Sequence, residues 1–414
     1  MRRKPGQVAA AKLPRGPSAK NKEALVIHPK LSVYGGAEYL CLYTCMILQK
    51  LGYHVDLVSD DYDPARVQAL FGMGNVLSEC THISLPVTKS RILNRFLPLQ
   101  RLVYTWKLAR FANSLNKIDV SIVLSTQSSI FAFPGKRLYH FVYEVSDLFC
   151  YPMPIAKGAV SRGGRAKRAY FAFLRFVYNA KAGSPSPLWF FVTGQSVLEE
   201  LKSMGHENSS FFYPPARMFN LKLPKKRQVV KACRIAPEKR LEFMFEVAHK
   251  LPEYDFYLVG KNLPAHLASN PGYSDRLFAE KPTNVHYTEA LIRDRPELLE
   301  QSKVYFHTGL ERGILLILIE AMSAGCVLVV PEDGVAGEVV RAAGVGYQYR
   351  TVEEAVEKLK NAMDGSIPWT PMEISEKAAE LGPKGFEDMI TRLVEHGPEA
   401  AVKTQTYRSI TRPR

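Results

Sequence analysis

Short apolar runs rich in β-branched residues alternate with longer stretches of helical period along most of the 414-residue sequence. This alternation is typical of β-α-β units, because two neighbouring parallel strands need a crossover connection between them. We therefore expect an α/β protein with parallel sheets. The chain is longer than the size at which one hydrophobic core usually stops growing, which favours two domains.

The alternation occurs in two blocks. In the first, ALVIHP (24–29) precedes a Gly-Gly turn and the helical stretch AEYLCLYTCMILQKLG, and the strand-like runs HVDLVS, SIVLST, RLYHFVY and LWFFVTG follow. A tract with Pro-Pro and a charge cluster, SSFFYPPARMFNLKLPKKRQ, then breaks the pattern. QVVKACR restarts it, and the strand-like runs DFYLVG, NVHY, KVYFHT and CVLVVP follow. We expect two Rossmann-like domains, 23–216 and 217–380, that face each other across a cleft, with ligands at the carboxyl ends of the strands.

The net charge of +15 lies almost entirely in the first half of the chain. Residues 1–216 contain 27 Lys and Arg against 13 Asp and Glu, whereas the remainder contains 28 against 27. Within the first half, 80–118 and 148–198 each carry seven basic and no acidic residues, interleaved with aromatic residues. We favour contact with an anionic membrane surface; a solvated helix face is the alternative. No nucleic-acid recognition motif accompanies these residues, so no nucleic-acid partner is expected.

The two chain ends and the cysteines indicate in which cellular compartment the protein is expected. Residues 1–22 contain seven basic and no acidic residues and no apolar stretch, so we expect a disordered basic tail rather than a signal peptide, and a second tail over 399–414. No apolar run approaches the roughly 20 residues that span a bilayer. The six scattered cysteines lack the spacing of a zinc site and favour a reducing compartment. We expect a cytoplasmic protein bound peripherally to the cytoplasmic face of a membrane.

Two glycines and two cations follow strands at places where a phosphate group can bind. Gly35 and Gly36 stand between the first strand and its helix, where the backbone can approach phosphate and helix N–H groups point at it. The third glycine of a dinucleotide fingerprint is absent. Arg234 follows the first strand of the second block in ACRIAPEKR, and Lys239 is expected to open the next helix. These two cations suit a diphosphate. Glu238 could instead pair with either cation in a structural salt bridge.

Three further polar residues border apolar runs. His140 lies in the strand-like run RLYHFVY and matters only if its strand end faces the cleft; an ordinary core or surface histidine is the alternative. Glu311 and Glu320 flank the six aliphatic residues 314–319. Carboxylates rarely border an interior unless an acceptor is needed there. Glu320 could accept both hydroxyl groups of a ribose.

In this order and at these separations, the motifs resemble those of the retaining glycosyltransferases of family 4, which have the GT-B fold. The resemblance covers residues 24–397 and is most specific in GGAE (35–38), RIAPEK (234–239) and IEAMSAGCVLVVP (319–331). Within the family, the sequence is most similar in look to mannosyltransferases that extend lipid-linked oligosaccharides and to their archaeal relatives.

The resemblance implies a nucleotide-sugar donor held mainly by the second domain. Arg234 and Lys239 would contact its diphosphate, and Glu320 its ribose. Gly35 and Gly36 would contact the phosphate side from the first domain. Because two side-chain cations would meet the diphosphate, no metal or other cofactor is expected.

The resemblance also places His140 beside the transferred sugar, and we expect a helix over 381–398 that returns to the first domain. One feature departs from the family. Its paired glutamates are separated by seven residues, whereas Glu311 and Glu320 are separated by eight. Either the loop shifts so that Glu311 contacts the donor sugar, or Arg312 takes the place of the first glutamate and Glu311 faces solvent.

We therefore expect a retaining enzyme that moves a hexose, with mannose from GDP-mannose as the best candidate, to a membrane-held, lipid-linked acceptor. Two alternatives remain open. A metal-dependent GT-A-type transferase would bind its metal through Asp61 and Asp63 of DDYD. A catalytically inactive GT-B scaffold would bind lipid or protein partners.

Overall fold

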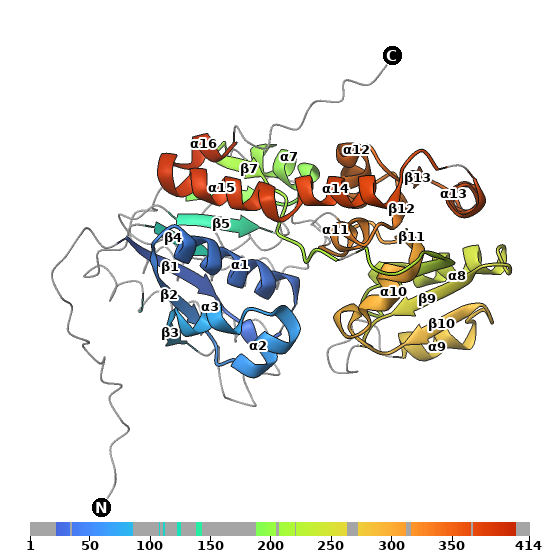
Figure 1. Cartoon of the computed structure of the whole chain (residues 1–414), viewed down its shortest axis with the longest axis horizontal. Coiled ribbons are helices and arrows are strands. Elements are labelled where there is room, and N and C mark those ends of the chain that lie inside the picture. Colours follow the sequence, from blue (N-terminus) through green and yellow to red (C-terminus); the bar gives the residue numbers. More distant parts are fainter. Residues whose placement is uncertain are drawn as a thin grey trace, which may run out of the picture.

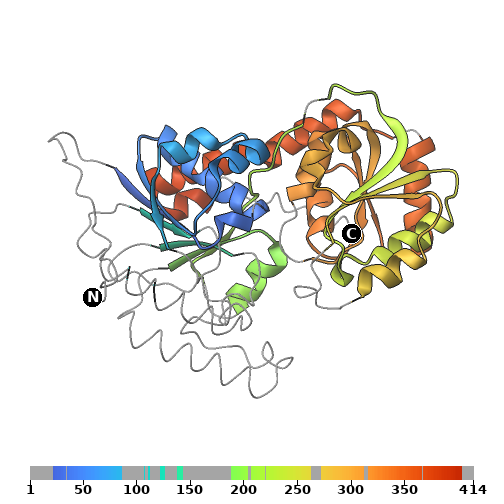
Figure 2. The same ribbon diagram turned by 90° about the horizontal axis from the view of Figure 1, so that it is seen from below.

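The computed structural model describes residues 22–33, 35–85, 107, 111, 122–125, 138–142, 188–203, 207–219, 221–262, 272–311, 316–365 and 367–402. Two α/β domains lie side by side, each built on a parallel sheet, which confirms the expected fold class (Figures 1 and 2). Most of the two expected terminal tails and most of the basic stretches 80–118 and 148–198 lie outside the described residues. Residues 399–402, expected to belong to a disordered tail, instead form part of a short helix.

The first domain contains a seven-stranded sheet in the order β3-β2-β1-β4-β5-β6-β7, and neighbouring strands pair in parallel. The strands are β1 (Glu23–His28), β2 (His54–Ser59), β3 (Thr81–Ser84), β4 (Ile122–Ser125), β5 (Leu138–Val142), β6 (Leu188–Val192) and β7 (Ser209–Phe211). The strand order reverses direction between β1 and β4. Parallel sheets commonly bind ligands at such a switch point.

The described helical elements of the first domain are η1 (Leu31–Val33), α1 (Gly36–Lys50), α2 (Pro64–Phe71), α3 (Gly74–Ser78) and α7 (Gln195–Ser203). α2 has clear start and stop signals. Asp63 caps its first amides, Pro64 occupies its first position, and Gly72 ends it in the left-handed conformation with φ of 69°. α1 is largely buried against the sheet.

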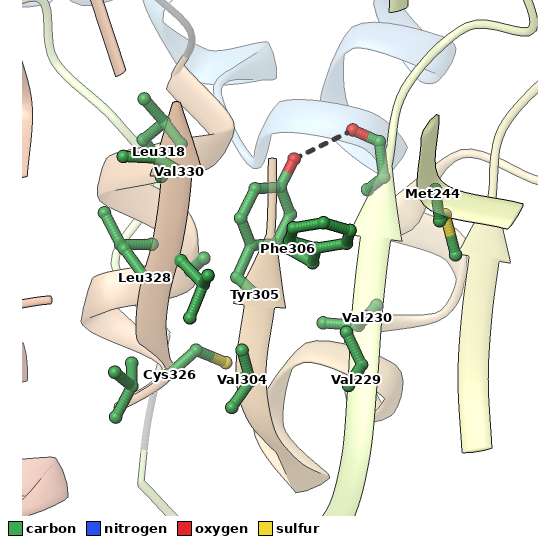
Figure 3. Packing of buried hydrophobic residues seen from close by; sticks show 14 of the residues in the cluster. Val229, Val230, Met244, Val304, Tyr305, Phe306, Leu318, Cys326, Leu328 and Val330 are labelled. Atoms are coloured by element: carbon green, nitrogen blue, oxygen red, sulfur yellow. Dashed lines mark hydrogen bonds between the residues drawn. The ribbon is translucent and has the colours of Figure 1, made fainter. Parts of the chain in front are cut away.

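The second domain contains a six-stranded sheet in the order β10-β9-β8-β11-β12-β13, again with parallel pairs. The strands are β8 (Lys226–Ala232), β9 (Asp255–Val259), β10 (Val285–Thr288), β11 (Ser302–Phe306), β12 (Val327–Pro331) and β13 (Tyr347–Tyr349). Here the switch point lies between β8 and β11. Figure 3 shows the apolar packing around β11, where the hydroxyl of Tyr305 donates a hydrogen bond to the carbonyl of Ala232 at 3.2 Å.

The described helical elements of the second domain are η3 (Pro237–Lys239), α8 (Leu241–His249), α9 (Tyr273–Ala279), η4 (Ile292–Asp294), α10 (Pro296–Gln301), α11 (Leu316–Ser323), α12 (Val335–Ala343) and α13 (Val352–Asp364). η3 corrects one expectation. Lys239 ends this short 3-10 turn rather than opening the following helix, because Arg240 adopts a left-handed conformation with φ of 49° before α8 begins.

The last helices join the two domains. They are α14 (Pro371–Leu381), α15 (Pro383–His396) and α16 (Pro398–Val402). α14 packs on α11 of the second domain, and α15 returns to pack on the first (Figure 1). The fully buried Phe386 of α15 contacts the rings of Phe141 and Phe212. α15 therefore completes the hydrophobic core of the first domain.

The expected strands lie within a few residues of the observed ones. The sequence does not predict β3, β7 and β13, whose segments THIS, SSF and YQY are short and lack an apolar run. Neighbouring strands and helices hold these edge segments in place, which is a tertiary effect that local sequence does not record.

Candidate functional site

A cavity of about 530 Å³ lies between the two domains. The start of α1 lines it from the first domain, and the segments that follow β8, β9, β10 and β11 line it from the second. These segments leave the carboxyl ends of parallel strands, where α/β sheets bind ligands. The predicted site residues that line this cavity are Gly35, Gly36, Arg234, Lys239, Glu311 and Glu320.

The Gly35–Gly36 turn is fixed by the buried carboxylate of Glu38. One oxygen of Glu38 accepts a hydrogen bond from the backbone N–H of Gly35 at 2.5 Å, and the other lies 3.2 Å from Nε2 of His28. Burial acts to lower the pKa of His28, but Cys41 and Glu38 outweigh it and raise this pKa. Since the Gly35 amide is engaged, a phosphate would meet the next amides of the α1 start.

Gly36 lies where the two domains approach each other closely. A Cβ atom at Gly36 would be 2.8 Å from Cδ1 of Leu316 at the start of α11, a distance that real Cβ contacts essentially never show. A larger residue would fit here only if the end of the Leu316 side chain moved, so glycine suits the contact between α1 and the second domain. The positive end of the α1 dipole consequently faces the cavity.

The two predicted phosphate-binding cations have different surroundings. Lys239 is 8% exposed, and its Nζ lies 2.5 Å from Oε1 of Glu311. The Arg234 side chain is 60% exposed, and its Nη2 lies 3.5 Å from Oε1 of Glu238. Glu238 thus pairs with Arg234, as the structural alternative supposed, although this exposed pair is weak. Both cations border the cavity, and their role in diphosphate binding stays a prediction.

The Glu311 side chain lines the cavity and is largely buried. One of its oxygens contacts Lys239, and the other lies 2.9 Å from Nε2 of His307. Burial lowers the pKa of His307 to about 4, so this imidazole is neutral and its Nε2–H donates to Glu311. Burial acts to raise the pKa of Glu311, but the bonds from His307 and Lys239 outweigh it and hold this pKa well below its usual range.

Glu320 lines the cavity and has a buried, unsatisfied acceptor. It is 4% exposed, and its Oε1 has no hydrogen-bond partner in the part of the chain that the structure describes. Burial raises the pKa of Glu320, while Arg293, Arg217 and a hydrogen bond from the backbone N–H of Arg217 oppose the rise. A buried acceptor without a partner is costly unless a ligand supplies a donor. Glu320 is therefore suited to bind a hydroxyl group.

Two predicted positions fall partly or wholly outside the described residues. His140 is the middle residue of β5, in register with Ser125 and Phe190, but its side chain is not described. The sequence suggests that His140 lies at the end of its strand, but β5 continues to Val142. Arg312 belongs to the segment 312–315, which is not described.

The carboxylates of the DDYD motif have structural roles. Asp63 accepts hydrogen bonds from the first amides of α2, and Asp61 accepts one from the hydroxyl of Ser84 at 2.6 Å. Among the described residues, no group of three or more His, Cys, Asp or Glu side chains is arranged to hold a metal ion. The presence of two Rossmann-like domains contradicts the GT-A-type alternative.

Sequence inspection missed three polar residues of this region. Arg293 and His307 line the cavity, and Lys231 lies fully buried in β8, with no hydrogen-bond partner for Nζ among the described residues. Burial lowers the pKa of Lys231. His307 directly follows β11 and could have been found by inspecting strand ends. Arg293 and Lys231 carry no local signal, because their importance comes from tertiary neighbours.

The buried, neutral His307 predicts that stability falls in mild acid. Its pKa of about 4 lies below the ordinary value near 6.5, so the unfolded chain binds a proton that the folded protein does not. Stability is therefore lost as the pH falls from about 6.5 toward 4, by up to about 3 kcal/mol. His307→Gln keeps an N–H for Glu311 but does not titrate, so we expect a flatter profile in denaturant titrations between pH 6.5 and 5.

This pH window lies above the ordinary pKa of a glutamate, so loss of the Glu311 charge contributes little there. His396→Gln is the control, because His396 is exposed at the end of α15. It should follow the unaltered protein. Parallel profiles for the unaltered protein and His307→Gln would contradict the prediction.

Comparisons with known proteins agree with this architecture. Residues 226–364 match a family model described as "Glycosyl transferases group 1". A search of curated proteins returned no matching sequence.

Several solved structures are similar over most of the chain. Sucrose-phosphate synthase from Thermosynechococcus elongatus has a TM-score of 0.62 and 12% identity, over 90% of this chain and 98% of that one. HepE from Anabaena, solved with UDP and glucose, has a TM-score of 0.60 and 14% identity, over 90% and 99%. WaaG, a glycosyltransferase involved in lipopolysaccharide biosynthesis, has a TM-score of 0.58 and 15% identity, over 89% and 99%. The chain thus has the two-domain GT-B fold of glycosyltransferases, and its second domain matches the group 1 model.

Proposed function

We propose that this protein is a glycosyltransferase that uses a nucleotide-sugar donor. The observation that carries the proposal is the cavity between the domains, where the cations Arg234 and Lys239 border the same space as the unsatisfied carboxylate oxygen of Glu320. The match of residues 226–364 to the group 1 glycosyltransferases supports it. So does the similar fold of HepE, which was solved with UDP and glucose.

In this proposal the donor diphosphate lies beside Lys239, Arg234 and the start of α1. The ammonium of Lys239 has three N–H groups, so a contact with Glu311 leaves others for phosphate oxygens. Arg234 is exposed and can exchange its weak contact with Glu238 for a phosphate. As the bond to the sugar breaks, negative charge grows on the diphosphate, and these fixed positive groups stabilise it. No divalent cation is required for this step.

The donor ribose binds to Glu320. Its free Oε1 accepts a hydroxyl hydrogen, and the backbone N–H of Arg217 holds the carboxylate in place. Because the acceptor is already desolvated, a ribose hydroxyl gains a charge-assisted hydrogen bond without a further cost of burying Glu320. This pairing gives the buried carboxylate of Glu320 a role in the cavity.

The transferred sugar lies near Glu311, with His140 beside it. The configuration at its anomeric carbon is retained through a front-face reaction. The acceptor hydroxyl attacks from the side of the leaving group, and an oxygen of the departing diphosphate takes the hydroxyl proton. Glu311 binds sugar hydroxyls rather than the phosphate, because it is negatively charged and already holds Lys239.

Mannose from GDP-mannose is the best candidate donor, because VIHPKLSVYGGAE, LYHFVYE and KVYFHT resemble the corresponding segments of mannosyltransferases. The UDP bound to HepE makes a UDP-sugar the other donor to test. We propose a lipid-linked acceptor at the cytoplasmic face of a membrane, approached through the basic and aromatic stretches 80–118 and 148–198. WaaG, involved in lipopolysaccharide biosynthesis, is a glycosyltransferase of similar fold. No helix in the described residues is long and apolar enough to cross a bilayer.

Transfer assays on the purified full-length chain test the activity directly. A panel of nucleotide sugars and lipid-linked acceptors, read out by mass spectrometry, should show hexose transfer from GDP-mannose that EDTA does not reduce. Arg234→Ala should lower turnover about 10²-fold or more, the scale of losing one donor to a developing negative charge. Arg295→Ala is the control, because Arg295 pairs with Glu297 on the same domain and does not line the cavity.

A strict requirement for a divalent cation would contradict the mechanism. If no nucleotide sugar is turned over while nucleotide still binds, the inactive GT-B scaffold becomes the better description.

Calorimetry separates the roles of the two carboxylates. Glu320→Gln should weaken both the free nucleoside diphosphate and the intact donor by about 1.5–3 kcal/mol, because each loses a charge-assisted hydrogen bond to the ribose. Glu311→Gln should weaken only the intact donor, because the Glu311 carboxylate contacts the sugar and not the nucleotide. Loss of its charge also frees Lys239 to bind phosphate. Unchanged binding in Glu320→Gln, or equal losses of both ligands in Glu311→Gln, would refute this division.

Vesicle binding tests whether the basic stretch 80–118 contacts the membrane. Each Lys or Arg near an anionic surface contributes roughly 1 kcal/mol. Replacing five cations of this stretch by Gln should therefore release the protein from phosphatidylserine vesicles in a sedimentation assay. The five are Arg91, Arg95, Arg101, Lys107 and Arg110.

A matched variant replaces five exposed cations elsewhere and should still bind. These are Lys222, Lys250, Lys360, Lys384 and Arg392. Equal release of both variants would show that net charge alone matters, and undiminished binding by the first variant would discard this stretch as the membrane contact.

A further inference from the structure

Arg293 reaches from the second domain to aromatic rings of the first. It lies in η4, after β10, and its side chain is 11% exposed and lines the cavity. Its guanidinium carbon is 4.6 Å from the ring centre of Phe71, at the end of α2, and 5.7 Å from that of Tyr39 in α1. The two rings are 5.8 Å apart and form an aromatic pair. Figure 1 shows α1 and α2 on the side of the first domain nearest the second.

The same guanidinium is the counter-charge of Glu320. Nη2 of Arg293 lies 3.9 Å from Oε1 of Glu320, and both side chains are almost fully buried. This separation is too long for a hydrogen bond, so the attraction leaves the lone pairs of Oε1 available. Arg217 also favours the charged form of Glu320, but Arg293 is the stronger of the two cations. Arg293 therefore opposes the effect of burial and favours the charged form of Glu320.

The aromatic pair fixes where this counter-charge lies. A cation over an aromatic face gains up to about 2 kcal/mol when it is shielded from water. Arg293 receives this stabilisation only while the two domains are in contact, because Phe71 and Tyr39 belong to the first domain. If the domains separate, water replaces the rings and the guanidinium is free to leave Glu320.

We propose that Arg293 is a positioning residue that couples contact between the domains to donor binding. It links the aromatic pair Tyr39–Phe71 of the first domain to the donor-binding carboxylate Glu320 of the second. Phe71 and Tyr39 do not line the cavity, yet they set the affinity of the second domain for a nucleoside diphosphate. The inference rests on the proposed donor site and adds to it a contribution from the first domain.

Binding of GDP and of UDP to the full-length chain, measured by calorimetry, tests this coupling. Phe71→Leu keeps an apolar side chain but removes the aromatic face, and should weaken the nucleotide about 3- to 10-fold. Phe71→Tyr keeps the face and should bind as the unaltered protein does. Tyr62→Leu is the control, because the ring of Tyr62 contacts His82 of the same domain and not Arg293.

A double-mutant cycle isolates the route through Arg293. Arg293→Met should weaken the nucleotide about 10-fold or more, and Arg293→Lys should restore most of the affinity because it keeps the charge. In the Arg293→Met background, Phe71→Leu should have no further effect.

Two results would overturn the inference while leaving the donor site intact. One is unchanged nucleotide affinity in Phe71→Leu. The other is an equal loss from Phe71→Leu with and without Arg293, which would mean that Phe71 acts only through general packing. If the unaltered protein binds neither GDP nor UDP, the proposed donor site is itself wrong and the inference fails with it.

Discussion

Mutual compensation of buried charges holds the candidate site together. Lys239 with Glu311, and Arg293 with Glu320, are two pairs of opposite charge in largely buried surroundings. Removing one partner would leave the other buried charge less well compensated, which costs free energy. Each pair also joins separate segments: the first links the turn after β8 to the segment after β11, and the second links η4 to α11. The charges therefore fix the arrangement of the loops as well as the electrostatics of the cavity.

The parallel topology explains why these segments can meet. In a parallel sheet all strands end at the same edge, so the segments after β8, β10 and β11 leave from one side of the second domain. β8 and β11 flank the switch point, where the following connections diverge to opposite faces and leave room for a ligand. The first domain supplies the α1 helix start from its own switch point beside β1. A larger residue at Gly36 would displace the end of the Leu316 side chain.

The fold was largely predictable because alternating apolar runs record it along the whole chain. The glycines, Arg234, Lys239 and Glu320 could be named from motifs at strand ends, and they do border one cavity. Arg293 could not be named, because its neighbours Phe71 and Tyr39 lie in the other domain and nothing local marks the contact.

Lys239 was found by its motif but assigned to the wrong local structure. The left-handed Arg240 separates it from α8, and no glycine marks that conformation in the sequence. His140 was placed at a strand end, although β5 continues two residues beyond it. Backbone details of this kind depend on tertiary packing and not on residue type.

The register of Glu311 has a physical explanation in its backbone contacts. Its carbonyl oxygen accepts a hydrogen bond from the N–H of Val335 at 2.9 Å, at the start of α12. Its side chain is held by His307, which directly follows β11, and by Lys239. All three contacts come from outside the segment that separates Glu311 from α11. These three contacts therefore fix the position of Glu311 beside the cavity.

This placement has a consequence for the phosphate site. Because Glu311 already compensates much of the Lys239 charge, a diphosphate at this site would meet less positive charge than two unpaired cations would present. The remaining positive charge must come from Arg234, which has only a weak surface partner, and from the dipole of α1. The first domain then contributes to phosphate binding through a helix end and to ribose binding through the aromatic contacts of Arg293. A donor would therefore be held fully only when the two domains are in contact.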